Sequence, residues 1–271
     1  MLAIACVKQV PDTTQVRIDP VTNTLVREGV PFIMNPFDTH ALEECLRLKA
    51  RFGFRVVVLS MGPPNTALML RKALALGADD ALLLCDRAFA GADTLATSMA
   101  LTEAIRKLSE QDELGLVVCG KQTIDGDTAQ VGPGIATRLG IPQLTLVDHI
   151  ENLDLSTRKL RARRHLEGRF EIVEAPLPAL ITVTREINRL RYPTVPGRLM
   201  AEDAEVAVWS NKELQASEEL IGLKGSPTKV RRIFSPQRSK GEILGEDVAD
   251  PSARAGLVVD KLVAADILQA S

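Results

Sequence analysis

The sequence is poor in aromatic side chains: its 271 residues include seven Phe, one Tyr and one Trp. It also lacks an excess of charge of either sign, because 33 Lys and Arg residues face 35 Asp and Glu residues. Nucleic-acid-binding domains usually carry a basic surface, often with aromatic residues on which bases stack. We therefore expect no nucleic-acid partner.

Long apolar runs are missing as well. No apolar stretch approaches the roughly 20 residues that span a bilayer, so we expect no transmembrane segment. Residues 2–7 are apolar, but Lys8 ends this run and no cleavage site follows, which argues against a signal peptide. These absences together lead us to expect a cytoplasmic protein.

Closely spaced cysteines are also absent. The four cysteines lie far apart and form no CxxC pair: they are Cys6, Cys45, Cys85 and Cys119. Zinc and iron–sulfur sites usually take ligands from such close pairs, so we expect no metal site. The cysteines are more typical of buried, reduced thiols.

The sequence does contain an alternation of short apolar runs and helical patterns. Near-continuous apolar strands of this kind are typical of a parallel sheet that helices cover on both faces. We therefore predict an α/β fold with a doubly wound, mostly parallel sheet. The predicted strands cover residues 2–7, 55–60, 81–85, 116–119 and 179–184, and the predicted helices begin at residue 36 and cover residues 65–76, 93–110 and 128–139.

Local signals add detail to this pattern. Asn35 is a preferred N-cap residue and proline suits the first helical position, so the first long helix is expected to begin at Pro36. Glu43 and Arg47 are four residues apart and are expected to pair on the surface of this helix. Two hairpins are also predicted, one across residues 16–26 and one with strands at residues 160–166 and 169–174.

The regular pattern weakens beyond Tyr192. Residues 193–271 contain scattered prolines and glycines, and only residues 257–268 have a convincing helical pattern. We therefore divide the chain into an α/β domain of residues 1–192 and an extended C-terminal arm of residues 193–271. On composition alone, the arm either wraps around its own domain or lies on a partner chain.

The stretch from Gly120 to Pro133 is the most informative part of the sequence. It leaves a strand and enters a helix, and open parallel sheets bind ligands at such strand ends where the strand order reverses. Gly126 permits a left-handed backbone, so that successive amides can converge on an anion. Thr128 and Gln130 would add a hydroxyl and an amide donor.

One feature of the same stretch argues against a phosphate ligand. Asp125 and Asp127 would repel a phosphate unless they cap the helix, bind a ribose hydroxyl or point away. Neither GxGxxG nor GxxxxGK[ST] is present, so the sequence contains neither a Rossmann fingerprint nor a Walker loop. The alternative interpretation is a tight strand–helix connection without a ligand.

Three further loops are expected to meet near this point, at residues 35–38, 60–63 and 86–97. Thr94 and Thr97 lie three residues apart on one helix face, where hydroxyl groups would suit a phosphate. The convergence of several such loops favours a ligand site. A set of ordinary caps and turns is the alternative.

Signals for bond-making catalysis are weak. The three histidines, His40, His149 and His165, form no recognisable set with a nucleophile, so we assign no catalytic residue. Four arginines gather in the second hairpin and indicate either a solvated face or a surface for an acidic partner: Arg161, Arg163, Arg164 and Arg169.

With these segments in view, the chain resembles the beta subunit of electron transfer flavoproteins. The resemblance covers essentially the whole chain. The motifs that carry it stand in the family's order: Lys8–Asp12, Met34–Asp38, Met61–Pro63, Ala75–Asp79, Gly120–Pro133 and Asn188–Tyr192.

The resemblance implies an α/β fold of the adenine-nucleotide-binding type. It also implies a heterodimer with a larger alpha subunit, which carries an FAD and is embraced by the C-terminal arm. In ordinary members the beta site holds AMP as a structural ligand. The residues that match its contacts are Cys6, Asn35, Pro36, Phe37, Asp38, Met61, Gly120, Lys121, Gln122, Thr123, Ile124, Asp125, Gly126, Asp127, Thr128, Ala129, Gln130 and Val131.

One subgroup of the family replaces AMP by a second FAD and bifurcates electrons from NADH. One electron goes to a high-potential acceptor, such as an acyl-CoA dehydrogenase, a related flavoprotein or a quinone reductase, and the other to ferredoxin or flavodoxin. The chain resembles this nitrogen-fixation and anaerobe type in the segments Asp86–Ser98 and Asp125–Pro133. The resemblance thus implies FAD in the beta site, with Asp93, Thr94 and Thr97 as additional contacts.

The segment Thr184–Tyr192 resembles the loop by which the family recognises partner dehydrogenases. An exposed aliphatic side chain is the anchor in that loop, and Ile187 occupies its position here. Asn188, Arg191 and Tyr192 accompany it, whereas Leu190 stands where the family usually has proline. The alternative is a strand end that packs locally.

Two other functions stay open at this point. One is an ordinary beta subunit that holds structural AMP and shuttles electrons from acyl-CoA dehydrogenases. The other is a stand-alone regulatory module that binds adenine nucleotides. The weakly periodic arm argues against the stand-alone module, because such an arm suggests an obligate partner.

Overall fold

The computed structural model describes residues 1–12, 17–18, 25–26, 31–229 and 241–268. The contacts within the chain divide it into two compact units, Met1–Arg231 and Arg232–Ser271.

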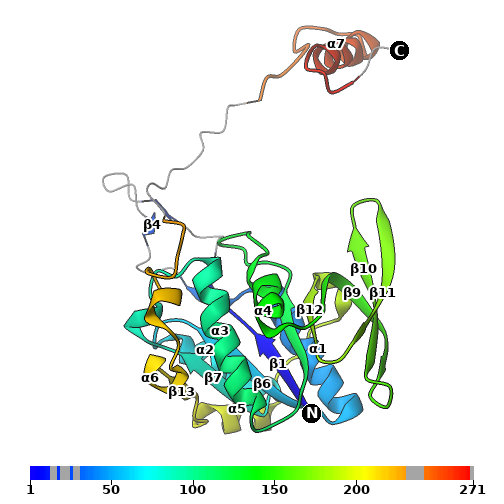
Figure 1. Ribbon diagram of the computed structural model, residues 1–271. Coiled ribbons are helices and arrows are strands. Elements are labelled where there is room, and N and C mark those ends of the chain that lie inside the picture. Colours follow the sequence, from blue (N-terminus) through cyan, green and yellow to red (C-terminus); the bar gives the residue numbers. More distant parts are fainter. Residues whose placement is uncertain (13–16, 19–24, 27–30, 230–240, 269–271) are drawn as a thin grey trace. The chain divides into compact units, whose positions relative to one another are not determined.

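A nine-stranded sheet forms the centre of the first unit (Figure 1). Its strand order is β11-β10-β9-β12-β8-β1-β6-β7-β13. The seven strands from β9 to β13 run parallel, and β10 is antiparallel to both of its neighbours. The strands are β1 (Leu2–Cys6), β6 (Arg55–Met61), β7 (Asp80–Leu84), β8 (Leu114–Gly120), β9 (Gln143–Asp154), β10 (Lys159–Leu166), β11 (Arg169–Pro176), β12 (Ala179–Val183) and β13 (Ala207–Trp209).

Helices cover both faces of this sheet, which confirms the predicted doubly wound α/β fold. Helices α1 (Pro36–Phe52) and α2 (Thr66–Leu76) pack on one face, and α3 (Thr94–Ser109) and α4 (Val131–Leu139) pack on the other. Shorter helices complete the unit: η2 (Arg87–Phe89), η3 (Arg185–Ile187), α5 (Val195–Glu202), α6 (Asn211–Leu214) and η4 (Glu218–Leu220).

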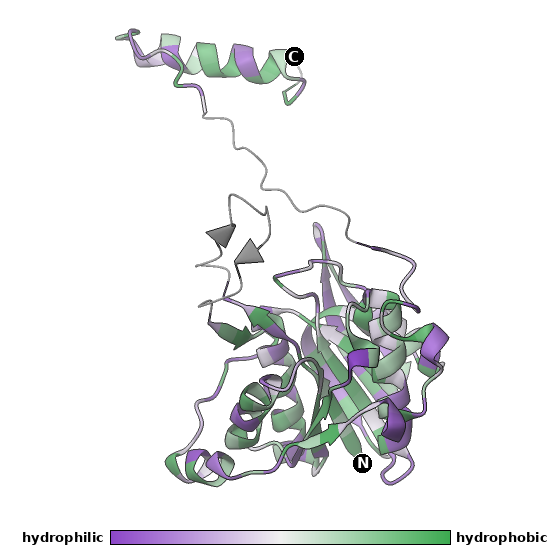
Figure 2. Cartoon of the chain, turned by 90° about the vertical axis from the view of Figure 1, so that its left-hand side faces the viewer, coloured by the Kyte–Doolittle hydropathy of each residue, from purple (hydrophilic) through white to green (hydrophobic). Residues whose placement is uncertain are grey.

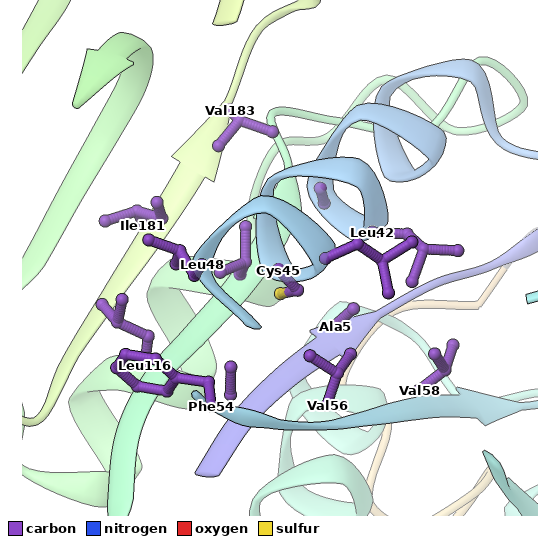
Figure 3. Close-up of a cluster of buried hydrophobic side chains, with 14 of the residues drawn as sticks. Ala5, Leu42, Cys45, Leu48, Phe54, Val56, Val58, Leu116, Ile181 and Val183 are labelled. Atoms are coloured by element: carbon purple, nitrogen blue, oxygen red, sulfur yellow. The ribbon is translucent and has the colours of Figure 1, made fainter. Parts of the chain in front are cut away.

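The central strands alternate their side chains between the two layers, as the pleat of a strand requires. In β1, Ala5 belongs to the cluster under α1, whereas Ile4 belongs to the cluster under α3 and α4. Leu42 and Cys45 of α1 point toward Ala5 and Val56 (Figure 3). Small side chains on β1 let α1 approach the sheet closely.

Two small antiparallel pairs lie between β1 and α1 in the chain. Strand β2 (Gln9–Pro11) pairs with β5 (Phe32–Met34), and β3 (Arg17–Ile18) pairs with β4 (Leu25–Val26). The second pair confirms the two strands of the hairpin predicted across residues 16–26; its connecting residues lie outside the described part of the chain.

The first unit extends beyond the predicted domain end at residue 192. Strand β13 pairs in parallel with β7, and Arg71 of α2 donates from Nε to the carbonyl of Ala204 at 3.2 Å. Residues 193–231 therefore belong to the sheet domain, because β13 completes one edge of its sheet. Only the part after Arg231 remains as a separate C-terminal arm.

The second unit contains α7 (Pro251–Ala264), which begins earlier than the predicted helix over residues 257–268. Asp250 caps it by accepting the backbone amides of Ser252 and Ala253. Apolar residues run along this helix (Figure 2), and Leu257, Val258 and Val259 are exposed within the chain. In the described ranges, no helix is both long and apolar enough to cross a membrane.

Candidate functional site

The strand order reverses next to β1. From β1 the chain proceeds to β6 and β7 on one side, and it then returns to β8 on the other side. The last register pair of β1 and β8 is Cys6 with Cys119, after which the two strands diverge. A crevice outside the carboxyl ends of such neighbouring strands is the usual ligand site of open α/β sheets.

Asp38 lies at the ends of both strands, at the edge of the sheet that we call the switch-point crevice. Its buried carboxylate accepts the amide of Lys8 at 2.8 Å and the amide of Gly120 at 3.2 Å. A Cβ atom on Gly120 would lie 2.3 Å from Asp38 Oδ1, so no larger residue fits there. In the structure its carboxylate contacts the ends of both strands, and the predicted contact of Asp38 with a ligand stays a prediction.

Burial dominates the titration of Asp38. Removal of its carboxylate from water raises its pKa from 3.8 to about 7, against the lowering effect of its hydrogen bonds. The neighbouring Cys119 thiol also has a raised pKa, because of its hydrogen bond with Cys6 and its burial. Both thiols are buried and free of disulfides.

Asn35 begins α1 as predicted, but its side chain does not cap the helix. Its Nδ2 donates to the carbonyl of Gln122 at 2.9 Å, and its Oδ1 accepts the amide of Ile124 at 3.2 Å. Pro36 occupies the first turn, as expected. Asn35 therefore holds the loop after β8 against the start of α1, because the fold brings this loop within reach of its amide group.

The loop after β8 differs from the prediction in two respects. The left-handed residues are Asp127, with φ 49°, and Ala129, with φ 55°, rather than Gly126. Helix α4 begins at Val131, three residues after the predicted start at Thr128. Non-glycine residues in this conformation are uncommon and cost free energy, so the surrounding contacts hold the loop in place.

The two aspartates of this loop have partners. Lys8 Nζ lies 2.6 Å from Asp125 Oδ2, and Gln122 Nε2 donates to Asp127 Oδ1 at 2.7 Å. Their charges are therefore turned toward these donors. The Lys8 cation offsets the charge of Asp125, whereas the donor to Asp127 is a neutral amide, so the repulsion of an anionic ligand is reduced at Asp125 alone.

The amides that follow are free to bind an acceptor. Residues 125–130 are exposed, and within the described chain the amides of Thr128, Ala129 and Gln130 have no hydrogen-bond acceptor. They precede the N-terminus of α4, where the first amides of the helix also lack intrahelical acceptors. This combination suits an anionic group.

The loop before α3 reaches the same edge. Asp93 caps α3 by accepting the amides of Leu95 and Ala96, and its other oxygen accepts from Thr228. Thr94 Oγ1 donates to Gln130 Oε1 at 2.7 Å. The predicted site segments 86–98 and 125–133 are therefore in direct contact.

The remaining predicted residues surround this edge. Met61 ends β6 and packs beside the cluster under α3 and α4. Thr97 is half-buried in the first turn of α3. Two cations lie over the Phe37 ring, with Lys121 Nζ 5.0 Å and Arg185 Cζ 4.8 Å from its centroid. Thr123 accepts the Asp127 amide through its carbonyl at 2.9 Å.

The switch-point crevice is an open surface of this chain. Two surface cavities, of about 510 and 840 Å³, lie elsewhere: one beside α1 and β9, the other beside β7 and β13. Neither is lined by residues 120–131. Residues 125–130 are exposed, so a ligand bound at this loop would lie on an exposed surface of the described chain.

The structure of the predicted docking segment, residues 184–192, differs from the expectation at Ile187. Ile187 is 5% exposed and belongs to the core cluster under α1, so it is not an exposed anchor. Leu190 and Tyr192 are exposed instead, and Tyr192 is 92% accessible. The reason is that η3 turns Ile187 inward before the chain leaves the sheet.

Helix α1 holds this segment through its acidic residues. Glu43 does not pair with Arg47; its buried carboxylate accepts the Arg191 guanidinium at 2.8 and 3.0 Å. Asn188 donates from Nδ2 to Glu44 Oε2 at 3.0 Å, and Arg47 pairs with Glu44 as well. The predicted surface pair of Glu43 with Arg47 is therefore wrong, because Glu43 faces the chain that returns from β12.

Sequence reasoning missed two contributors to these sites. Lys8 was part of a motif but not of the predicted site, and Glu43 was placed on the surface. No local pattern identifies Lys8 as part of the site. A carboxylate among the apolar positions of a helix was the one available signal for Glu43.

Comparisons with known proteins agree with this geometry. The family model of the electron transfer flavoprotein domain matches residues 22–214. Protein FixA of Azotobacter vinelandii is 48% identical over 265 residues, which cover 97% of this chain and 94% of FixA. Electron transfer flavoprotein subunit beta of Clostridium acetobutylicum is 48% identical over 263 residues, which cover 97% and 98% of the two chains.

A third relative is subunit CarD of the caffeyl-CoA reductase-Etf complex of Acetobacterium woodii. It is 44% identical over 265 residues, which cover 97% of this chain and 98% of CarD. The similarity thus extends over nearly the full length of each of these proteins. The chain therefore belongs to the electron transfer flavoprotein family, and within it to the beta-subunit type.

Proposed function

We propose that the chain is the beta subunit of a bifurcating electron transfer flavoprotein and holds an FAD at the switch-point crevice. Together with an alpha subunit, which carries a second FAD, it takes electrons from NADH. One electron passes to a high-potential acceptor, an acyl-CoA dehydrogenase or a related flavoprotein or quinone reductase. The other passes to ferredoxin or flavodoxin.

The hydrogen bond between Thr94 and Gln130 carries this proposal. It joins the two segments in which the sequence resembles bifurcating members, 86–98 and 125–133, at one edge of the sheet. A dinucleotide is longer than AMP and has a pyrophosphate, so it needs donors on both sides of such an edge. Relatives named FixA and CarD, a subunit of a reductase-Etf complex, support the same interpretation.

The residues present fit a dinucleotide. The amides of Thr128, Ala129 and Gln130 lack acceptors within the described chain, and the nearby carboxylates have their own donors. We assign the phosphates to these amides and to the hydroxyl of Thr97. The Thr94 hydroxyl has one hydrogen, so it would join them only by exchanging its bond to Gln130 Oε1 for one to the phosphate. A bound flavin would supply the ability to accept and release electrons singly or in pairs.

The open crevice also supports a partner chain. An isoalloxazine ring on this edge would be exposed to water in the described chain alone, whereas flavin potentials are tuned by the surrounding protein. We assign the missing cover to the alpha subunit. The arm with its exposed apolar helix α7 is the segment that we expect to bind that subunit.

We further assign docking of the acceptor dehydrogenase to the end of the segment 184–192. Tyr192 is the exposed aromatic residue there, and Asn188 and Arg191 hold the segment on α1. Tyrosines are enriched in binding hot spots, because they bury a large area with few rotatable bonds.

The test is to purify the chain with its alpha subunit, denature the complex and count the released flavin and AMP. Two FAD and no AMP per complex is the expected result. One FAD and one AMP would replace the proposal by the ordinary electron-shuttling subunit. A stable monomer that binds adenine nucleotides without a partner would favour the regulatory module.

A further inference from the structure

A buried carboxylate, Asp38, lies at the edge of the sheet where the crevice is placed. Asp38 is 5% exposed, and among the residues that the structure describes it takes part in no ion pair. Lys8, whose backbone amide contacts Asp38, instead places its Nζ 2.6 Å from Asp125 Oδ2. Buried carboxylates without a cation are costly unless hydrogen bonds satisfy their oxygens.

Both oxygens of Asp38 are satisfied by backbone amides from different strands. Oδ2 accepts the amide of Lys8, two residues beyond the end of β1, and Oδ1 accepts the amide of Gly120 at the end of β8. These two strands pair only as far as Cys6 and Cys119. Beyond this last pair, the Asp38 carboxylate links the two chains, because it accepts one backbone amide from each.

The surrounding chain leaves no freedom for another arrangement. At Gly120 an added Cβ would approach Asp38 Oδ1 to 2.3 Å and the Phe37 Cβ to 2.7 Å. Asp38 is also anchored by its own helix, because its amide donates to the carbonyl of Asn35 at 2.9 Å. The position of the carboxylate thus determines the distance between the two strand ends.

We propose that Asp38 is the positioning residue of the nucleotide site: its carboxylate ties the ends of β1 and β8 together and so fixes the width of the crevice. It does so without contacting the nucleotide. The inference rests on the proposed function to the extent that a nucleotide occupies the crevice.

The charge of Asp38 matters to this role. An ionised carboxylate offers acceptors to both amides, whereas a protonated one turns a hydroxyl hydrogen toward one of them. The charged and titratable groups around it are Lys8 beyond β1, Cys6 and Cys119 at the strand ends, Lys121 and Asp125 in the loop after β8, and Arg185 of η3. None of these replaces Asp38 as an acceptor for the two amides.

The first experiment measures hydrogen exchange at the amides of Lys8 and Gly120 in the complex with the alpha subunit. After correction for intrinsic exchange, protection at these two amides is expected to fall as the pH drops through about 7. Amides in the middle of β1 and β8 serve as internal references. Protection that does not change with pH would overturn the proposal, and this measurement requires no substitution.

The second experiment compares Asp38→Asn with Asp79→Asn. The asparagine side chain in the first variant would keep one acceptor and present an NH₂ group to the other amide. We therefore expect the beta-site nucleotide to bind the complex at least about tenfold more weakly. Asp79 accepts the strand amide of Val56 at 2.8 Å at the opposite end of the sheet, and its variant should retain the nucleotide. Both variants should retain the alpha-site flavin.

The positioning role of Asp38 and the proposed function can be refuted separately. Retention of the nucleotide and of both protected amides in Asp38→Asn would refute the positioning role. A wild-type complex that contains neither FAD nor AMP in the beta site, but shows the pH-dependent protection, would refute the proposed function and leave the positioning role intact.

Discussion

At the residue scale, helix α1 carries three acidic side chains that are almost fully buried: Asp38, Glu43 and Glu44. Each is offset by a specific donor, namely backbone amides, the Arg191 guanidinium and the Asn188 amide group. Removal of one partner from such a pair leaves the other unsatisfied and costs more than removal of both. These three positions should therefore tolerate substitution poorly.

Asp38 should give the chain a characteristic dependence of stability on pH. Its pKa is raised from 3.8 to about 7, so between these values the folded chain binds a proton that the unfolded chain has released. The free energy of unfolding should therefore fall as the pH rises from about 4 to about 7, by up to roughly 4 kcal/mol from this group. Urea unfolding at several pH values measures this slope.

The Asp38→Asn variant is the control for this slope, because an amide does not titrate. Its stability should change less than that of the wild type over the same pH range. An unchanged slope in the variant would assign the effect to other groups.

Loss of the hydroxyls at the start of α3 should weaken the binding of one of the two flavins and not of the other. Replacement of Thr94 and Thr97 by valine removes the Thr94–Gln130 hydrogen bond and both hydroxyl donors. On the proposed function, the beta-site flavin should bind at least about tenfold more weakly while the alpha-site flavin is spared. Thr137→Val on α4, where the hydroxyl only bonds the carbonyl of Pro133, is the matched control. Equal loss of both flavins would contradict the assignment.

At the element scale, α1 connects the two surfaces to which we assign functions, the switch-point crevice and the segment 184–192. Its first turn holds the crevice through Asn35 and Asp38, and its next turns hold the returning chain through Glu43 and Glu44. The crevice and the segment 184–192 are therefore both fixed to this one helix. The short η3 helix completes this arrangement by placing Ile187 in the core under α1.

Ile187→Ala should consequently reduce stability. Loss of a buried aliphatic side chain typically costs about 2–5 kcal/mol. Ile172→Ala, on β11, removes a side chain that is 53% exposed and should cost far less. Chemical denaturation of the two variants provides the comparison. A variant at Ile187 that is as stable as the wild type would place this side chain outside the core.

At the scale of the whole molecule, the chain consists of a sheet domain that ends at Arg231 and a C-terminal unit with α7. The sheet domain has its own two apolar layers, one on each face. Nothing in these layers comes from residues after Arg231 among those described. The domain should therefore fold without the arm.

Deletion of residues 232–271 tests this independence. The shortened chain should keep the cooperative unfolding transition of the sheet domain, because its core is complete. On the proposed function it should bind the alpha subunit much more weakly than the full chain, which co-purification would show. A shortened chain that is unfolded would mean that the arm contributes to the core.

The sequence predicted the elements whose pattern is local. Apolar runs correctly identified β6, β8 and β12, and glycines marked the ends of α2 and α4. It did not identify β13, a strand of three residues that is defined by its pairing with β7. Strand β9 was also missed, although it is the longest of the sheet at 12 residues.

The sequence by itself determined the fold class, because burial on both faces of a parallel sheet leaves a continuous apolar pattern in each strand. The order of its motifs also determined the family. Only the tertiary structure decided that Asp38 joins two strand ends, that Glu43 binds Arg191 and that Ile187 is buried. These contacts link residues about 80 to 150 positions apart, so they depend on how the strands are ordered, and a local pattern contains no information about that order.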